Sequence, residues 1–227
     1  MFSLSVIGCA SSSSYDNLYG ASTSNPPYLQ KLLVLPVDIT IEERFPGNIF
    51  EDIPPWTRMA NKTVAEEFTT IFKSELKGQA ILYSEIKDAS AIDPYLPLIR
   101  NVSQAVRIHT RGFDLWPWKM AHFDYTIGNG LTALRHNGVD AVLYISGYQS
   151  VEAFRPDSSK ESVYTYRKAD LSLGDLYIAL TLIDTASGEL LWNYAGTFSN
   201  IDLRDNSEVR ETLFQALTKF PRQILKG

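Results

Sequence analysis

An alternation in which every second residue is Leu or Ile is the clearest pattern in the sequence, and it predicts a β-hairpin over residues 176–198. Every second residue from 176 to 182 is Leu or Ile, which is how a strand separates its two faces. The polar turn that follows contains Asp184, whose side chain can bond its own backbone, and Gly188, which tolerates positive φ. The chain then returns with one apolar face formed by Leu190, Trp192 and Tyr194. We therefore expect two antiparallel strands here.

Upstream, the hydrophobic pattern predicts a strand, a helix and a second strand in that order. Residues 31–37 form a short apolar run, typical of a strand that is buried on both faces. Residues 38–56 are rich in acids, proline and glycine, and we expect a loop there. A helical stripe of apolar residues follows over 57–77, with Gly78 as its stop signal, and 80–86 has the pattern of another strand. This order predicts a parallel crossover.

The middle of the chain predicts two helices separated by an irregular insertion. In the first helix, over 94–108, apolar residues recur every four positions, at Leu98, Val102 and Val106. The second helix spans 124–137 and ends at Gly138. Its inward side chains are expected to be Tyr125, Ile127, Leu131 and Leu134. The insertion, near 109–123, is rich in aromatic residues but has no period, so we expect a loop.

The remaining elements complete an α/β fold. Residues 141–145 have the pattern of a buried strand, 151–168 that of an irregular strand or long hairpin, and 206–220 that of a helix. The expected buried face of this helix is Val209, Leu213, Ala216, Leu217 and Phe220. Together the elements predict a mixed β-sheet covered by helices, with a strand-helix-strand start, a late antiparallel hairpin and a C-terminal helix. We expect one domain, over 29–227.

Composition and charge exclude several classes of function. The chain has 227 residues, which suits one domain with a substantial core. A net charge of -5 and an isoelectric point near 5.3 provide no attraction for phosphate backbones, so no nucleic-acid partner is expected. No stretch approaches the ~18 consecutive apolar residues of a membrane-spanning helix.

The titratable and nucleophilic residues form no motif of catalysis or metal binding. The histidines, His109, His122 and His136, lie far apart and lack the spacing of metal ligands. Ser146 and Gly147 follow a strand, but the glycine that precedes the serine in a nucleophile elbow is missing. No glycine-rich phosphate loop is present. We therefore predict no catalytic residue, no metal, no cofactor and no enzyme activity.

Cys9 is the only cysteine, and its surroundings indicate a lipid anchor. Val6-Ile7-Gly8-Cys9 resembles the bacterial lipobox, in which the cysteine becomes acylated and amino-terminal. Two or more acyl chains are what firm anchoring to a bilayer requires. Only eight residues precede Cys9 and none is basic, so residues 1–9 are expected to be the remnant of a lipoprotein signal peptide. Residues 10–28, rich in Ser, Asn, Pro and Gly, are expected to be a flexible tether.

Three further segments resemble known envelope proteins. The strand end Leu35-Pro36-Val37, the strand at 140–143 and the hairpin residues 182–192 (LIDTASGELLW) resemble a broad group of bacterial envelope lipoproteins. The group includes the curli-secretion lipoprotein, the lipoprotein activators of penicillin-binding proteins and the amino-terminal domain of the Tol translocation protein. Residues 123–128 and 201–205 are more similar to an uncharacterised lipoprotein family of Gram-negative bacteria.

The resemblance implies a periplasm-facing, lipid-anchored and non-enzymatic domain that binds a protein or glycan component of the cell envelope. By the habit of such lipoproteins, Ala10 rather than Asp after Cys9 favours the outer membrane. No family active site is carried over, and the oligomeric state stays open.

The aromatic insertion is the one site-like feature of the sequence. Phe113, Trp116 and Trp118, with charged residues between them, have the composition of an interface hot spot. Alternatively they cap the core beneath a long loop. We expect an envelope protein whose domain binds or scaffolds another component. The alternatives are a periplasmic hydrolase or glycan-processing enzyme that uses the 109–124 loop, and a subunit of an oligomeric secretion or pore assembly.

Overall fold

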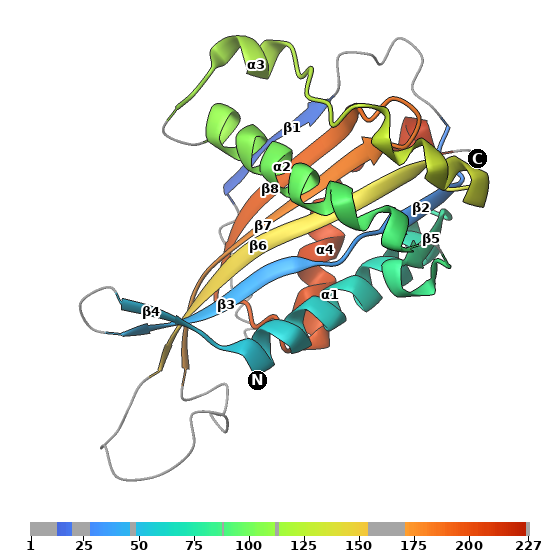
Figure 1. Cartoon of the computed structure of the whole chain (residues 1–227). Coiled ribbons are helices and arrows are strands. Elements are labelled where there is room, and N and C mark those ends of the chain that lie inside the picture. Colours follow the sequence, from blue (N-terminus) through green and yellow to red (C-terminus); the bar gives the residue numbers. More distant parts are fainter. Residues whose placement is uncertain are drawn as a thin grey trace, which may run out of the picture.

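A mixed β-sheet with helices on both faces forms the structure (Figure 1), which confirms the predicted α/β class. The computed structural model describes residues 13–19, 28–45, 49–87, 89–111, 114–153 and 171–225. The strands are β1 (Ser13–Tyr19), β2 (Lys31–Val34), β3 (Asp38–Phe45), β4 (Ile49–Asp52), β5 (Gln79–Leu82), β6 (Ala141–Ala153), β7 (Leu171–Asp184) and β8 (Leu190–Ser199). The α-helices are α1 (Pro54–Glu75), α2 (Leu96–Arg111), α3 (Pro117–Ala121) and α4 (Asn206–Leu217). Short 3-10 helices span Tyr83–Glu85, Ala89–Ala91, Asp93–Tyr95, Asn129–Asn137 and Arg222–Ile224.

The sheet runs in the order β1-β8-β7-β6-β2-β5. β2 pairs in parallel with β5 on one side and with β6 on the other, so the predicted parallel strand-helix-strand unit is confirmed. Its helix, α1, begins at Pro54, because proline is tolerated in the first turn. The residue in the left-handed region after α1 is Lys77, with φ 56°, rather than the expected Gly78.

The expectation of a loop over 38–56 is wrong. β3 pairs in parallel with β6, and β4 returns antiparallel to β3. Ile39 and Ile41 are buried beneath α1, whereas Thr40 points to the opposite face of the sheet. β2 and β3 therefore pair one after the other with the same side of β6, and Pro36 lies in the break between them.

The predicted hairpin is present as β7 and β8, and Leu182 lies opposite Trp192. The Asp184 carboxylate accepts a hydrogen bond from the Ser187 backbone N–H, and Gly188 has φ 71°. One prediction fails here, because Leu190 does not share a face with Trp192. A register shift between Leu182 and Ile183 turns Leu190 to the α2 side, so Leu190 and Trp192 belong to different core clusters.

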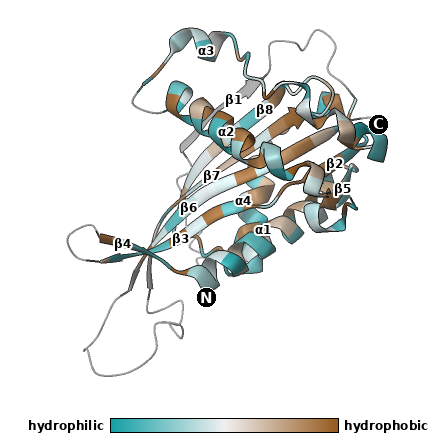
Figure 2. Cartoon of the chain, in the orientation of Figure 1, coloured by the Kyte–Doolittle hydropathy of each residue, from teal (hydrophilic) through white to brown (hydrophobic). Residues whose placement is uncertain are grey.

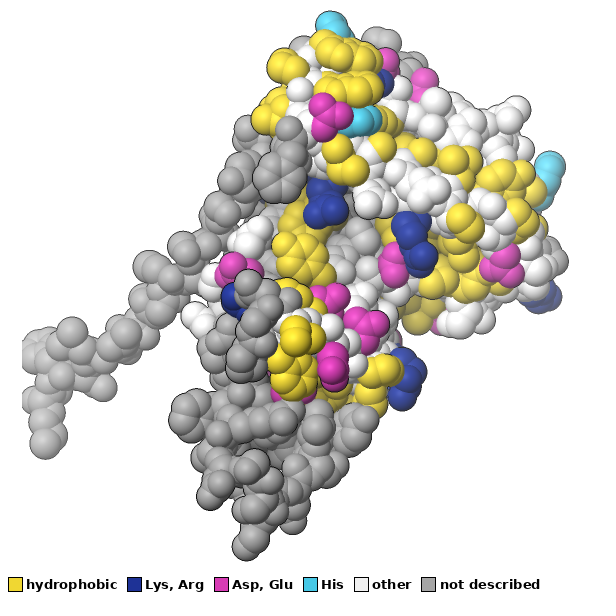
Figure 3. Space-filling model, turned by 60° about the vertical axis from the view of Figure 1, so that its left-hand side comes forward, with side chains coloured by type: hydrophobic (Ala, Val, Ile, Leu, Met, Phe, Trp, Pro, Cys, Tyr) yellow, Lys and Arg dark blue, Asp and Glu magenta, His cyan; other side chains and the backbone are white. Residues whose placement is uncertain are grey.

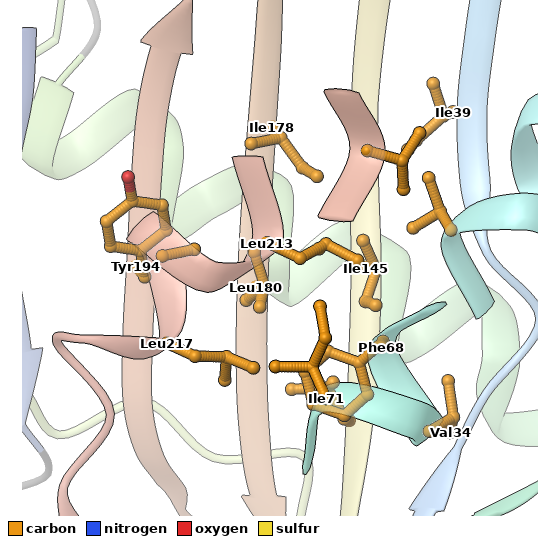
Figure 4. Packing of buried hydrophobic residues seen from close by; sticks show 14 of the residues in the cluster. Val34, Ile39, Phe68, Ile71, Ile145, Ile178, Leu180, Tyr194, Leu213 and Leu217 are labelled. Carbon is orange, nitrogen blue, oxygen red and sulfur yellow. The ribbon is translucent and has the colours of Figure 1, made fainter. Parts of the chain in front are cut away.

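Two hydrophobic clusters cover the two faces of the sheet. On one face α1 and α4 pack side by side against the central strands (Figure 4), and the predicted buried face of the last helix is confirmed. The labelled residues of this cluster are Val34, Ile39, Phe68, Ile71, Ile145, Ile178, Leu180, Tyr194, Leu213 and Leu217. On the other face α2 and the 3-10 helix Asn129–Asn137 cover Leu33, Val142 and Ile183. Hydrophobic residues recur along the strands, while hydrophilic and hydrophobic residues mix along α1 and α2 (Figure 2).

The middle of the chain differs from expectation in three ways. The second expected helix is a 3-10 helix that begins only at Asn129, although its four expected inward residues are all buried. In α2 the exposed Leu98 is not inward, since the buried face is Ile99, Ser103, Val106 and Thr110. The expected strand or hairpin at 151–168 is described only to residue 153, where it extends β6.

Within the expected tether, β1 pairs antiparallel with β8, from Ser13 opposite Thr197 to Tyr19 opposite Trp192. This strand differs from the expected flexible conformation over residues 13–19. Its pairing is favourable because it satisfies the edge of β8 that β7 leaves open.

Candidate functional site

A group of exposed hydrophobic side chains projects from the segment that contains α3. We call Leu115, Trp116, Trp118 and Met120 the aromatic surface; they are 53%, 36%, 51% and 48% exposed. Hydrophobic side chains gather at this end of the molecule in the space-filling view (Figure 3). Large apolar side chains that are exposed together, rather than singly, mark binding sites on soluble domains.

The end of α2 holds this segment in place. The Trp116 backbone N–H donates a hydrogen bond of 2.8 Å to the His109 carbonyl, in the last turn of α2. Pro117 then starts α3 with a preset φ. The indole of Trp116 lies on the His109 imidazole, with ring centroids 3.9 Å apart and planes within 7°, and it also stacks on Trp118 at 5.9 Å. The two indoles are therefore positioned before any partner arrives.

Lys119, the one cation of α3, is neutralised by a nearby carboxylate. The Lys119 ammonium lies 4.5 Å from the ring centroids of both Trp118 and Tyr125, and it forms an ion pair with Asp124. The hydrogen bond from Lys119 lowers the pKa of Asp124. Burial raises the pKa of Tyr125 to about 12, so its hydroxyl stays neutral near His109, whose Nδ1 lies 3.1 Å away. The Lys119 charge is therefore compensated beneath the apolar groups of the aromatic surface, and the exposed Asp114 lies at its edge.

Two of the three predicted partner-binding residues, Trp116 and Trp118, lie in the described part of the chain. Trp116 and Trp118 are exposed, which contradicts the alternative in which they cap the core. Phe123 and Tyr125, just after α3, cap the core instead. Phe113 and Cys9 lie outside the described residues, so their roles stay predictions.

The histidines do not converge on a site. His109 belongs to the stack with Trp116, while His122 and His136 are exposed. Across the part of the chain that the structure describes, no group of three or more His, Cys, Asp or Glu residues could hold a metal ion. Among the described helices none is long and apolar enough to cross a membrane.

A second feature, a polar pocket between α2 and the sheet, was missed by sequence reasoning. It has a volume of about 260 Å³, and Ser103 and Arg107 of α2 and Tyr177 of β7 contribute to its lining. One signal was available, because Ser103 and Arg107 are four residues apart and so share a face of the helix. The strands that complete the pocket are distant in sequence.

Comparison with known proteins gives no matching family model and no matching curated protein. Matching solved structures include the PelC dodecamer from Paraburkholderia phytofirmans, with 12% identity and a TM-score of 0.39 over 95% of this chain and 99% of that chain. A variant of the same dodecamer matches with 12% identity and a TM-score of 0.37, over 92% and 96% of the two chains. The Evf virulence factor matches with 12% identity and a TM-score of 0.18, over 94% and 86%. At these scores none of the three carries an argument about function.

Proposed function

We propose that this protein is a lipid-anchored component of the cell envelope whose α/β domain binds another envelope protein without catalysis. The observation that carries the proposal is the exposed, preordered aromatic surface. The acylation of Cys9, the periplasm-facing position and the outer membrane are parts of the same proposal, supported by the lipobox-like sequence and by the resemblance of the hairpin to envelope lipoproteins.

The chemistry of the aromatic surface favours a protein as the partner. Trp and Met are enriched in the cores of protein interfaces, where charged residues are depleted. The indole rings of Trp116 and Trp118 already stack on each other and on His109, so they are engaged with rings rather than left open for a sugar. Their edges, together with Leu115 and Met120, offer an apolar contact area that an apolar surface of a protein complements.

The test is affinity capture from solubilised envelope with the full-length lipidated chain. A Trp116→Ala/Trp118→Ala variant removes the indoles, and Phe214→Ala serves as a matched control because Phe214 is 44% exposed on α4, against the opposite face of the sheet. Ring stacking contributes only about 0.5–1.5 kcal/mol per pair, so the double variant is expected to stay folded.

We expect a protein captured by the wild type and by Phe214→Ala to be lost from the double variant. Purified partner should then bind the wild type directly, with affinity reduced at least about tenfold by the double substitution, as for an aromatic hot spot. Capture that is identical for the double variant would contradict the proposal. Capture of glycan alone, or of a second copy of this chain alone, would also contradict the proposal that the partner is another envelope protein.

A further inference from the structure

The pocket beneath α2 lies where the sheet changes from apolar to polar. Along β6 and β7 the side chains that face α1 and α4 are aliphatic, as at Ile145 and Ile178. On the α2 side Val142 and Ile183 belong to the core, but farther along the same strands Tyr148 and Tyr177 face the pocket. Burying polar groups without hydrogen bonds is unfavourable, so this part of the sheet face does not belong to the hydrophobic core. The pocket is therefore a distinct feature of the fold.

Two buried hydroxyl groups of the pocket have no hydrogen-bond partner in the described part of the chain. Ser103 is only 8% exposed, and neither its Oγ nor the Tyr177 Oη forms a hydrogen bond with any described residue. In helices a serine commonly bonds the carbonyl one turn earlier, as Thr110 does with Val106, but Ser103 does not. A buried hydroxyl without a partner is unfavourable, and a ligand that accepts a hydrogen bond from it removes that penalty.

The pocket also holds an arginine that has no carboxylate partner among the residues that the structure describes. Arg100 is neutralised by Asp38, whose Oδ2 lies 2.8 Å from the Arg100 Nε. Arg107, two turns farther along α2, makes no ion pair with any residue that the structure describes, and its guanidinium carbon lies 5.7 Å from the Tyr177 ring centroid. The net charge of the pocket side chains is therefore positive, because the lining contains two guanidinium groups, of Arg100 and Arg107, and one carboxylate, of Asp38. In the face shown in Figure 3, basic side chains stand on either side of a hollow.

We propose that this pocket binds a small organic anion, whose carboxylate or phosphate oxygens accept hydrogen bonds from Arg107, Ser103 and Tyr177. All three groups are donors, and a guanidinium matches a planar carboxylate or a phosphate in two-point geometry. The stacked pair of Tyr148 and Tyr177, with centroids 5.6 Å apart, lies beside these donors, and Tyr148 is 45% exposed. An aromatic ring beside an anion site suits a ligand of sugar size, which a volume of about 260 Å³ accommodates.

The site shares no residue with the aromatic surface, so each proposal can fail without the other. Calorimetric titration of the full chain with glucuronate, a phosphate ester of glucose, and glucose tests the ligand class. We expect binding of one or both anions and none of glucose. Binding of glucuronate alone identifies a carboxylate ligand, and binding of the ester alone a phosphate ligand. Binding of none of the three, or equal binding of all three, would overturn the proposal.

Variants test the residues. Arg107→Gln should weaken binding at least about tenfold, since it removes a charge-assisted donor. Arg210→Gln is the matched control, because it removes the same charge from an exposed position on α4, and it should leave affinity unchanged. Equal affinity of these two variants would overturn the assignment of Arg107.

Ser103→Ala distinguishes a binding role from a structural one. The variant should bind the anion more weakly, yet the unliganded protein should unfold at the same or a higher denaturant concentration, because an unsatisfied buried hydroxyl is gone. Tyr177→Phe should behave in the same way. If both variants lose stability and keep their affinity, the hydroxyls are structural and the proposal fails.

Discussion

The Tyr144 hydroxyl donates a hydrogen bond to Asp38, with 2.5 Å between Oη and Oδ2. Tyr144 lies on β6 and Asp38 begins β3, so the bond joins two parallel strands whose residues are 106 positions apart. Arg100 of α2 holds the same carboxylate oxygen. One carboxylate therefore ties two strands to the helix that covers them, at the edge of the polar pocket.

Removing this bond should destabilise the fold. Tyr144→Phe keeps the ring but removes the donor to a charged acceptor, and we expect the free energy of unfolding to fall by about 1.5–3 kcal/mol. Urea unfolding near neutral pH measures this change. Tyr148→Phe is the control, because Tyr148 is exposed and its variant should change stability by no more than about 0.5 kcal/mol. Equal losses for the two variants would contradict a stabilising role of the hydrogen bond between Tyr144 and Asp38.

The same tyrosine predicts a loss of stability in alkali. Burial, assisted by Asp38, raises the pKa of Tyr144 above its ordinary value of 10.0. Between that value and the higher folded pKa, the unfolded chain has lost the proton and the folded chain keeps it. Stability is therefore complete below about pH 10 and falls as pH rises, by up to about 1.4 kcal/mol per pH unit for such a tyrosine.

Unfolding series at several alkaline pH values should show this slope, and Tyr144→Phe should make it shallower. Tyr125, whose pKa burial raises to about 12, should contribute in the same direction. A variant slope equal to that of the wild type would contradict the assignment to Tyr144.

At two glycines that share the same φ, we expect substitution by alanine to lower the free energy of unfolding by different amounts. Gly138 and Gly188 both have φ 71°. A Cβ at Gly138 would meet no described residue within 4 Å, whereas a Cβ at Gly188 would lie 1.8 Å from the Gly128 carbonyl oxygen. Gly138→Ala should cost about 1–2 kcal/mol from backbone strain alone. Gly188→Ala should cost clearly more, because the hairpin turn must also move away from residue 128.

Thermal unfolding of both variants measures the difference between these costs. Equal destabilisation would mean that the turn relaxes freely. Because the Ile127 backbone N–H donates to the Gly188 carbonyl, a shifted turn should also speed hydrogen exchange at Ile127.

Elements with a local pattern could be predicted from the sequence. The hairpin and α4 repeat their apolar positions within one element, so burial on one side is visible without knowledge of the partner. The apolar run at 31–37 is likewise explained by burial on both faces, since Leu32 belongs to one core cluster and Leu33 to the other. In these segments local preference and tertiary packing agree.

Elements that depend on distant pairing could not be predicted. β3 contains an alternation of Ile39 and Ile41, but its acidic residues favoured a loop, and only pairing with β6 makes it a strand. The orientation of Leu190 depends on one register shift, which no local signal specifies. The pocket joins residues of β3, α2, β6 and β7, so no single segment of the sequence could reveal it.

The lipid anchor proposed at Cys9 predicts a change of location. The Cys9→Ser variant, expressed at the level of the wild type, should not incorporate labelled palmitate and should move from the membrane fraction to the soluble fraction. The reason is that a serine hydroxyl cannot take the thioether-linked lipid, and a domain without acyl chains has no firm hold on a bilayer. If the variant stays in the membrane fraction without label, the anchor is elsewhere.

Trp192 allows a comparison of two kinds of core substitution. Its side chain is fully buried, with its ring centroid 5.2 Å from that of Phe220. Its indole N–H nevertheless has no hydrogen-bond partner among the residues that the structure describes. Trp192→Phe should keep the aromatic packing and remove an unsatisfied donor, so the cost of the smaller ring is partly offset, and we expect a loss below about 2 kcal/mol. Phe68→Ala, in the same cluster, removes a whole ring and should cost about 3–5 kcal/mol.

Urea unfolding of the two variants gives both values, and near-ultraviolet circular dichroism checks that the core stays ordered. If Trp192→Phe lowers the free energy of unfolding as much as Phe68→Ala does, the expectation is wrong. The indole N–H would then have a hydrogen-bond partner in solution, and the side chains around Trp192 would pack too closely to adjust to the smaller ring.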